Sequence, residues 1–378
     1  MGAALACVLA GLLAAVWSGG AAIAVTDHIQ SFEALSEAVL AVCLFTAGLK
    51  LSGPLDWQTW RVPLALTFIT LPVTVALAAG VANVFLGLPM EQALLLGAIL
   101  GPTDPVLAWN LDLPSARAEA TRFVLAAEGA LGSCCALPLV QFGLGLNGYH
   151  DLGPFASRWI GLDLAWGLGG GAACGWFVGS LAARALRRFG LRGSIGLAEL
   201  AGLAGTLVLA CGVAFLLGSN EFLAALAAGA AIARAAVRPP RAVSAPRRVQ
   251  VLVSAAARVE RFAELVFLAA LGALLAVAKV HAGLVLYALL ILIAVRPLAA
   301  GLAFGAPSAD GPERRIVAWF GVRGVASMYY LMFALDQSSS ALAAGRLVAV
   351  TVSVLAISIA LHALTALPLG KRPAGEQG

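Results

Sequence analysis

Four ionisable residues lie well inside long apolar stretches of the sequence: Asp104, Glu128, Arg296 and Arg323. A charged side chain at the centre of a lipid bilayer costs roughly 2.5 kcal/mol or more, so residues of this kind mark ion, proton or substrate pathways by default. A buried carboxylate can be neutralised by a proton or by a bound cation, whereas an arginine keeps its charge. We therefore take these four residues as the candidates for the functional centre.

Asp104 lies in the sequence Gly-Pro-Thr-Asp-Pro at residues 101–105. Two prolines and a glycine this close together do not continue an α-helix, because proline lacks the backbone N–H and clashes with the preceding turn. Unwound backbone at membrane depth is tolerated only where it lines a cavity or is buried in protein. Asp104 could there hold a cation together with freed carbonyls, or take up a proton. A simple proline kink with a satisfied aspartate is the alternative.

A second interruption surrounds Arg323, in the sequence Phe-Gly-Val-Arg-Gly at residues 320–324. Paired interrupted helices in corresponding positions of two halves of a chain point to a transporter binding site. The end of a half-helix carries about half a unit charge, so Asp104 and Arg323 could offset opposite helix ends. A glycine pair that serves only helix packing is the alternative.

Glu128 and Arg296 are expected to contact each other. Both lie about 10–15 Å from the same end of their apolar stretches, at a rise of 1.5 Å per residue. Opposite charges at similar depth in lipid should pair, since an unpaired charge there is costly. The sequence therefore predicts a structural ion pair that holds two core helices together.

The remaining polar residues of the apolar stretches are expected to have no part in chemistry. Four carboxylates nearer the ends of these stretches are interpreted as interfacial side chains: Glu37, Asp163, Glu199 and Glu264. The four histidines are scattered and have no metal-ligand spacing: His28, His150, His281 and His362. The six cysteines all lie in apolar runs and are interpreted as small core residues. Neither an enzyme nor a metal or organic cofactor is expected.

Membrane-spanning helices must position these residues. The chain has 378 residues, of which 61% are hydrophobic and only 11% charged, whereas a soluble domain carries about 25% charged residues. A helix needs about 20 apolar residues to cross the hydrocarbon core. The apolar runs predict twelve spans, at residues 3–25, 34–51, 62–88, 92–110, 121–147, 159–183, 195–217, 220–237, 259–278, 282–306, 314–334 and 341–369.

The distribution of basic residues orients these spans. If the loops alternate between inside and outside, starting inside, all but five of the 24 lysines and arginines fall in inside loops. This asymmetry is what the positive-inside rule predicts for a cytoplasmic face. The first span is expected to be retained rather than cleaved, both termini to be cytoplasmic, and the arginine- and proline-rich segment 234–258 to be a cytoplasmic linker.

The predicted fold is an all-α polytopic membrane protein with a single transmembrane transporter domain, residues 1–378. Two inverted repeats, residues 1–147 and 195–369, are expected to flank a linking helix at 159–183. No segment is expected to form a soluble domain, and the net charge of +5 belongs to short loops rather than to a nucleic-acid surface.

Several segments resemble NhaP-like antiporters, which are monovalent cation:proton antiporters of type 1. Residues 97–108 are similar to the broken-helix motif of this family, and residues 44–51 to a second conserved segment. Residues 319–324 resemble its second broken helix, and Arg296 with the proline after it matches its buried arginine. The resemblance covers nearly the whole chain. It implies the antiporter fold with two crossed broken helices, a homodimer, and a place in a bacterial cytoplasmic (inner) membrane.

The sequence departs from the family in two places. The family usually has thirteen spans, so the first helix is expected to be missing here. In the family, the helix that carries the glutamate matched by Glu128 also carries an Asn-Asp pair, whose aspartate is the expected carrier. Gly132 and Ser133 occupy these positions here. Asp104 is therefore the remaining candidate for the titrating transport group, with Thr103 and Ser133 as neutral oxygen ligands.

The resemblance implies exchange of a monovalent cation, Na⁺ or K⁺, for H⁺. Both ions would compete for one buried carboxylate, since burial favours its protonated form. Two alternatives remain open at this point because the carrier aspartate is missing. The scaffold could serve another solute, as a symporter or a channel, or the chain could be a transport-dead sensor or structural homologue.

Overall fold

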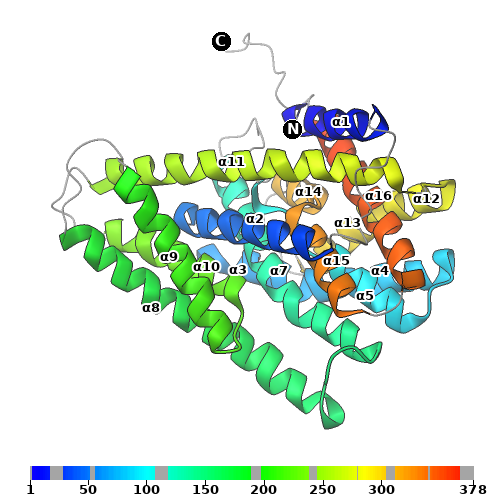
Figure 1. Cartoon of the computed structure of the whole chain (residues 1–378), viewed down its shortest axis with the longest axis horizontal. Helices are drawn as coiled ribbons and strands as arrows, with labels where there is room; N and C mark the ends of the chain where they lie inside the picture. Colours follow the sequence, from blue (N-terminus) through cyan, green and yellow to red (C-terminus); the bar gives the residue numbers. More distant parts are fainter. Residues whose placement is uncertain are drawn as a thin grey trace.

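The computed structural model describes nine stretches of the chain, namely residues 2–17, 29–51, 56–106, 118–188, 197–237, 245–278, 280–303, 311–338 and 341–366. These stretches are helical and contain no β-strand (Figure 1). The helices of the first half are α1 (Gly2–Trp17), α2 (Ile29–Lys50), α3 (Trp57–Ala65), α4 (Leu71–Leu86), α5 (Met90–Leu100) and α7 (Ala118–Leu146). Those of the second half are α8 (Gly167–Arg188), α9 (Leu197–Leu216), α10 (Glu221–Val237), α11 (Ala245–Val277), α12 (Ala282–Leu290), α13 (Arg296–Ala303), α14 (Gly311–Trp319), α15 (Val325–Gln337) and α16 (Ala341–Ala366).

Each of the twelve predicted spans overlaps at least one helix among the described residues. Among the described residues, five helices are long and apolar enough to cross a membrane by length and composition alone: Ile29–Lys50, Trp57–Leu86, Glu119–Leu146, Ala282–Ala303 and Gly345–Thr365. Several of the other segments are short because a break divides them. The all-helical fold is therefore as expected, whereas the number of crossings and the two inverted repeats stay predictions.

The segment between α10 and α11 differs from the prediction. The linker was expected to extend to residue 258, but α11 begins at Ala245 and has 33 residues. Pro246 does not prevent this, because a proline in the first turn of a helix lacks an N–H that would have no helical partner anyway. The alanines and arginines that follow are good helix formers. Of the expected linker, residues 238–244 lie outside the described residues.

Two segments of the chain share an arrangement of elements. In the first, α3 continues through a π-helical turn, Leu66–Thr70, into α4, and the broken helix α5 follows. In the second, α12 continues through a π-helical turn, Ile291–Val295, into α13, and the broken α14–α15 pair follows. This shared order supports the predicted repeats.

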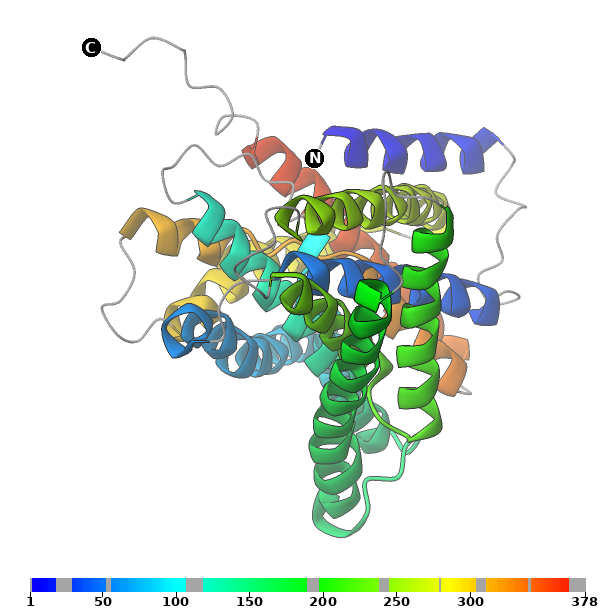
Figure 2. The ribbon, with the colours of Figure 1, turned by 90° about the vertical axis from the view of Figure 1, so that its left-hand side faces the viewer.

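Small residues allow the helices to pack closely. α1 lies along α11 at the edge of the molecule in both views (Figures 1 and 2). A Cβ atom built on Gly11 would stand 2.0 Å from the backbone oxygen of Ala269, and one on Gly272 would stand 2.0 Å from that of Val8. Close backbone approach through small residues is typical of helix contacts in membranes. It places α11 firmly in the bundle, beside α2 and α10.

Candidate functional site

The two helix breaks meet in the centre of the bundle. The first break, residues 101–104, follows α5, and the second, residues 320–324, separates α14 from α15. The backbone N–H of Asp104 donates to the carbonyl of Val322 at 2.8 Å. The predicted breaks are therefore confirmed, and they contact each other directly.

Arg323 lies at the C-terminal end of α5. Its guanidinium is fully buried, and its Nη1 donates to the carbonyls of Gly101, at 2.5 Å, and Pro102, at 3.1 Å. These carbonyls follow the last turn of α5, where the helix dipole is negative. Its own backbone N–H donates to Ser358 Oγ at 3.0 Å, which ties the second break to α16. The arginine thus offsets the negative end of one half-helix.

Asp104 lies at the N-terminal end of the other half-helix, α15. Its Oδ2 accepts from the N–H of Val325 at 3.2 Å, and its Oδ1 accepts from the N–H of Val106 at 2.8 Å. A Cβ atom on Gly324 would stand only 1.9 Å from Oδ2, so no other residue fits there without moving the carboxylate. A negative charge is stabilised at a helix N-terminus. The expectation that Asp104 and Arg323 offset opposite helix ends is therefore confirmed.

The expected contact between Glu128 and Arg296 is also confirmed. Arg296 Nη1 lies 2.6 Å from Glu128 Oε1, and its Nη2 donates to Oε2 at 2.8 Å. Both residues are buried, and this two-point geometry is the strongest that an arginine and a carboxylate adopt. The pair lies against the second break, since a Cβ atom on Gly321 would stand 2.4 Å from Arg296 Nε.

The helix α7 brings Ser133 to the first break. Ser133 Oγ donates to the carbonyl of Thr103 at 3.3 Å, and both side chains are buried. The hydroxyl of Tyr330, on α15, donates to the carbonyl of Ser133. A Cβ atom on Gly132 would meet nothing within 4 Å, so there is open space beside the buried Gly132. Thr103, Asp104 and Ser133 are therefore brought together, as the sequence analysis expected of an ion site.

An asparagine that the sequence analysis did not single out connects α7 to α10. Pro138 has no N–H, so the carbonyl of Cys134, one turn earlier, lacks its helical partner. Asn220 Nδ2 donates to this carbonyl at 2.8 Å, while Asn220 Oδ1 accepts from Leu223 N as the cap of α10. A proline within a predicted span was the signal that a side chain would be needed here.

The second group that the sequence analysis missed lies between α2 and α11. Lys50 Nζ contacts Glu260 Oε2 at 2.5 Å, and Glu260 is buried. Glu264, one turn further along α11, is 7% exposed. The interpretation of Glu264 as an interfacial carboxylate is therefore wrong, because α11 begins earlier than expected and carries this residue into the bundle. Of the other three, Glu37 is exposed, Asp163 is half-buried, and the side chain of Glu199 lies outside the description.

His362 lies near the C-terminal end of α16 and is buried. Its Nε2 lies 3.1 Å from the carbonyl of Trp319, where α14 ends, and its Nδ1 lies 2.7 Å from the carbonyl of Ser358. The ring therefore supports the second break through backbone oxygens. Among the described residues, no group of three or more His, Cys, Asp and Glu side chains could hold a metal ion.

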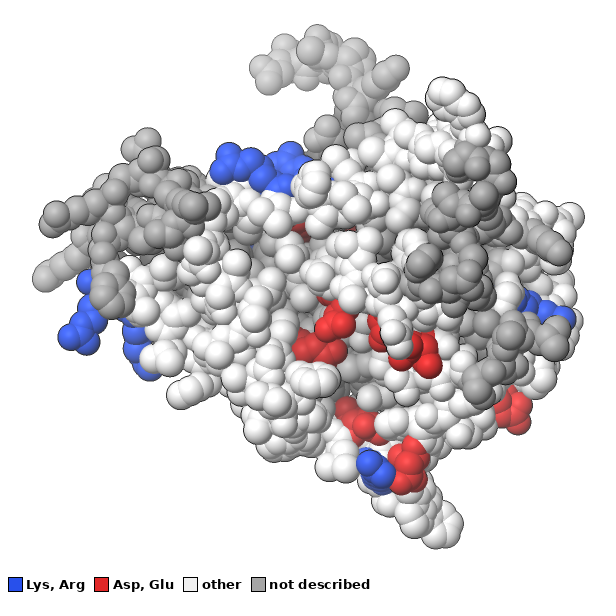
Figure 3. Space-filling view, in the orientation of Figure 1, with Lys and Arg blue, Asp and Glu red and all other residues white. Residues whose placement is uncertain are grey.

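Acidic side chains gather on one face, over the region of α2, α10 and α15 (Figure 3). The charge of Glu33 interacts with those of Glu37 and Asp336, and Glu221 interacts with Glu37. Basic side chains in the same view lie mostly toward the edges of the molecule. Such an acidic surface raises the local concentration of cations.

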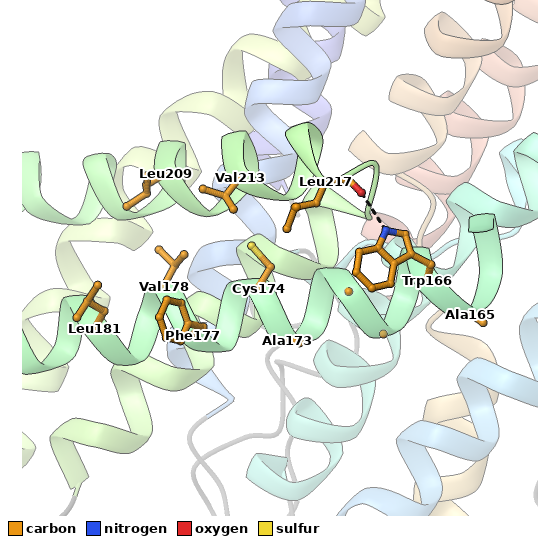
Figure 4. A pocket seen from close by; sticks show the side chains of 12 residues that line it. Ala165, Trp166, Ala173, Cys174, Phe177, Val178, Leu181, Leu209, Val213 and Leu217 are labelled. Carbon is orange, nitrogen blue, oxygen red and sulfur yellow. Dashed lines mark hydrogen bonds between the residues drawn. The ribbon is translucent and has the colours of Figure 1, made fainter. Parts of the chain in front are cut away.

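A groove of about 680 Å³ lies away from the breaks, between α8 and α9 (Figure 4). Trp166 closes one end, where its Nε1 donates to the carbonyl of Leu217 at 2.9 Å. The other lining residues shown, such as Phe177 and Leu209, are apolar, and none is charged. An apolar groove on a membrane protein cannot hold a bare cation, so the breaks remain the candidate site.

The fold and site define a polytopic helical membrane transporter with two crossed broken helices. The profile of the transmembrane sodium/hydrogen exchanger family matches residues 1–372, and the chain belongs to that family. Two solved structures of the sodium proton antiporter MjNhaP1 from Methanocaldococcus jannaschii, one at pH 8 and one an electron-microscopy map, share the fold with a TM-score of 0.74 and 19% identity. The first alignment covers 99% of this chain and 92% of that one, and the second covers 98% and 91%. No curated protein matches by sequence.

These findings bear on the expected activity. The family consists of transporters rather than enzymes, and family and fold together support cation:proton antiport. They give no support to K⁺ as the cation, to a symporter or channel for another solute, or to a transport-dead homologue. The roles expected of the individual site residues stay predictions.

Proposed function

We propose that this protein exchanges Na⁺ for H⁺ across a bacterial cytoplasmic membrane, with the cation bound where the two broken helices cross. The observation that carries the proposal is the position of Asp104, a buried carboxylate on unwound backbone, beside the oxygens of Thr103 and Ser133. Unwound carbonyls and half-helix ends are what secondary transporters use to coordinate Na⁺ or H⁺.

Each residue of the crossing has a separate part in this proposal. Asp104 supplies the negative charge, and Thr103 and Ser133 supply neutral oxygens that replace water around the cation. Arg323 keeps the end of α5 electrostatically balanced without touching the cation. Glu128 is committed to Arg296, so the pair holds α7 against α13 rather than taking part in transport.

Antiport follows if the site cannot hold Na⁺ and a proton at once. A buried, uncompensated charge is costly, so the site is stable when it holds either ion and unstable when it holds neither. The acidic face around Glu33, Glu37 and Asp336 supports a cation as the substrate, because it attracts cations toward the bundle. A homodimer and cytoplasmic termini are proposed from the family resemblance and from the loop charges.

Proton flux in proteoliposomes tests the function. A pH-sensitive dye inside the vesicles should respond when Na⁺ is added outside, and Li⁺ and K⁺ are measured separately. Asp104→Asn should abolish the Na⁺ response, whereas Glu91→Gln, at an exposed position of α5, should leave it unchanged. A K⁺ response without a Na⁺ response would contradict the proposed cation, and no response to any cation would contradict antiport.

A further inference from the structure

The buried charges of the described residues do not balance. Four carboxylates are buried in the bundle: Asp104, Glu128, Glu260 and Glu264. Three basic side chains accompany them, two fully buried and one 13% exposed: Arg296, Arg323 and Lys50. His362 contacts backbone oxygens rather than a carboxylate. The four carboxylates therefore outnumber these three basic side chains by one.

Contacts identify the carboxylate that carries this charge. Glu128 contacts Arg296, and Glu260 contacts Lys50. Asp104 accepts from two backbone N–H groups at the breaks. Glu264, 7% exposed, has no hydrogen bond or ion pair with another described residue. An ionised carboxylate in such a place is costly, so Glu264 is a candidate to hold a proton.

The space around Glu264 is polar. Glu260 and Glu264 lie one turn apart on α11, and Cys43, Thr46 and Lys50 are spaced to share one face of α2, which packs against α11. Glu260 Oε1 and Thr46 Oγ1 are both buried and have no hydrogen-bond partner among the described residues. Buried polar atoms without a partner are rare in proteins and indicate room for a water or an ion.

We propose that Glu264 is the carboxylate that takes up and releases the exchanged proton, at a polar site of its own between α2 and α11. This inference rests on the proposed antiport and names the group that holds the proton. The sequence, and the competition at the crossing described above, assigned that part to Asp104. The contacts of Asp104 with two N–H groups at a helix N-terminus favour its charged form instead.

Electrostatics couples this site to the crossing. The charge of Glu264 interacts with those of Asp104 at the break and Glu260 on its own helix, and with the positive charges of the chain's amino terminus and of Lys50 on α2. Cys43 on α2 lies within reach of the charges of Asp104, Glu260, Glu264 and Lys50. Na⁺ beside Asp104 offsets the repulsion between the two carboxylates, so Glu264 can release its proton. When Glu264 is protonated again, the cation loses part of its attraction and leaves.

Proton release on Na⁺ binding tests the proposal directly. Purified protein in detergent and weak buffer is mixed with NaCl, and a pH indicator records the protons released. Sodium binding is measured separately as the Na⁺-dependent rise in unfolding temperature. Glu264→Gln should still show a sodium-dependent rise, at higher Na⁺ concentrations than the wild type, but release at least tenfold fewer protons. Glu264→Asp should retain release with a shifted pH dependence, and Glu91→Gln should match the wild type.

The outcomes separate this inference from the proposed function. Normal proton release by Glu264→Gln would overturn the inference alone and return the proton to Asp104. A wild-type protein that releases no proton would overturn both proposals. Without Na⁺, Glu264→Gln should unfold no earlier than the wild type, because a neutral amide replaces a buried carboxylate that has no ion pair with another described residue. Earlier unfolding would contradict the charge assignment.

Discussion

Glu128→Gln should destabilise the protein strongly while leaving its shape unchanged. The substitution keeps the size of the side chain but removes the charge that faces Arg296. In the structure, the guanidinium has two contacts with Glu128, at 2.6 and 2.8 Å, and a weak one, at 3.5 Å, with the carbonyl of Val317. Its Nε is already buried without a partner among the described residues. The substitution therefore leaves a buried guanidinium without a counter-charge.

The expected loss follows from this geometry. Removing one partner of a buried ion pair costs about 3–5 kcal/mol. The upper part of this range applies because the side chains are only 3% and 6% exposed and Arg323 is a second buried cation whose charge interacts with that of Arg296. Exchanging the two residues, Glu128→Arg with Arg296→Glu, should recover part of the loss.

Unfolding of the purified protein in mixed detergent and SDS measures this effect. The free energy of unfolding of Glu128→Gln is compared with those of the wild type, the charge exchange and Glu91→Gln, which removes an exposed carboxylate. A Glu128→Gln protein within about 1 kcal/mol of the wild type would refute the reasoning, because an exposed ion pair contributes no more than that.

Three further predictions concern the breaks and the topology. Gly324→Ala should reduce antiport at least tenfold, because its Cβ would stand 1.9 Å from Asp104 Oδ2. Gly345→Ala is the control, because a Cβ there meets nothing within 4 Å. Equal sodium-dependent proton fluxes in the two variants would contradict the geometry. Gly132→Asn with Ser133→Asp restores the Asn-Asp pair of the family and should strengthen or alter exchange, because the space beside residue 132 is open. Exchange that stays the same as in the wild type would contradict the idea that loss of this pair changed the ion site. A cysteine introduced at position 2, in place of glycine, should be labelled only from the cytoplasmic side, and labelling from outside would overturn the twelve-span topology.

Local sequence could predict the two breaks and the central ion pair. Proline and glycine around Asp104 and glycine around Arg323 exclude a continuous helix whatever surrounds them. The depth of a residue in the membrane follows from its number of residues from the end of its span. Counting these residues was therefore enough to predict that Glu128 and Arg296 lie at similar depth and pair. The contact between the breaks, through Asp104 N and the carbonyl of Val322, followed only from the resemblance to a family with crossed helices.

The site between α2 and α11 could not be predicted in the same way. The depth of Glu264 was counted from an expected helix start at residue 259, whereas α11 begins at Ala245. The pair of Lys50 and Glu260 joins residues 210 positions apart, and no local pattern indicates such a contact. Glu260 and Glu264 are four residues apart, so a helix places them on one face. That spacing was the one local signal in the sequence for this group of carboxylates.

Coupled flux through the same vesicles tests the central claim most directly. Proteoliposomes with an imposed pH gradient and no other driving force are given radioactive sodium, and sodium uptake and proton loss are recorded together. The account predicts that wild-type protein accumulates sodium as it dissipates the pH gradient, and that Asp104→Asn protein, folded and inserted to the same extent, does neither. Coupled exchange that persists in Asp104→Asn would contradict the assignment of the ion site to the crossing of the broken helices.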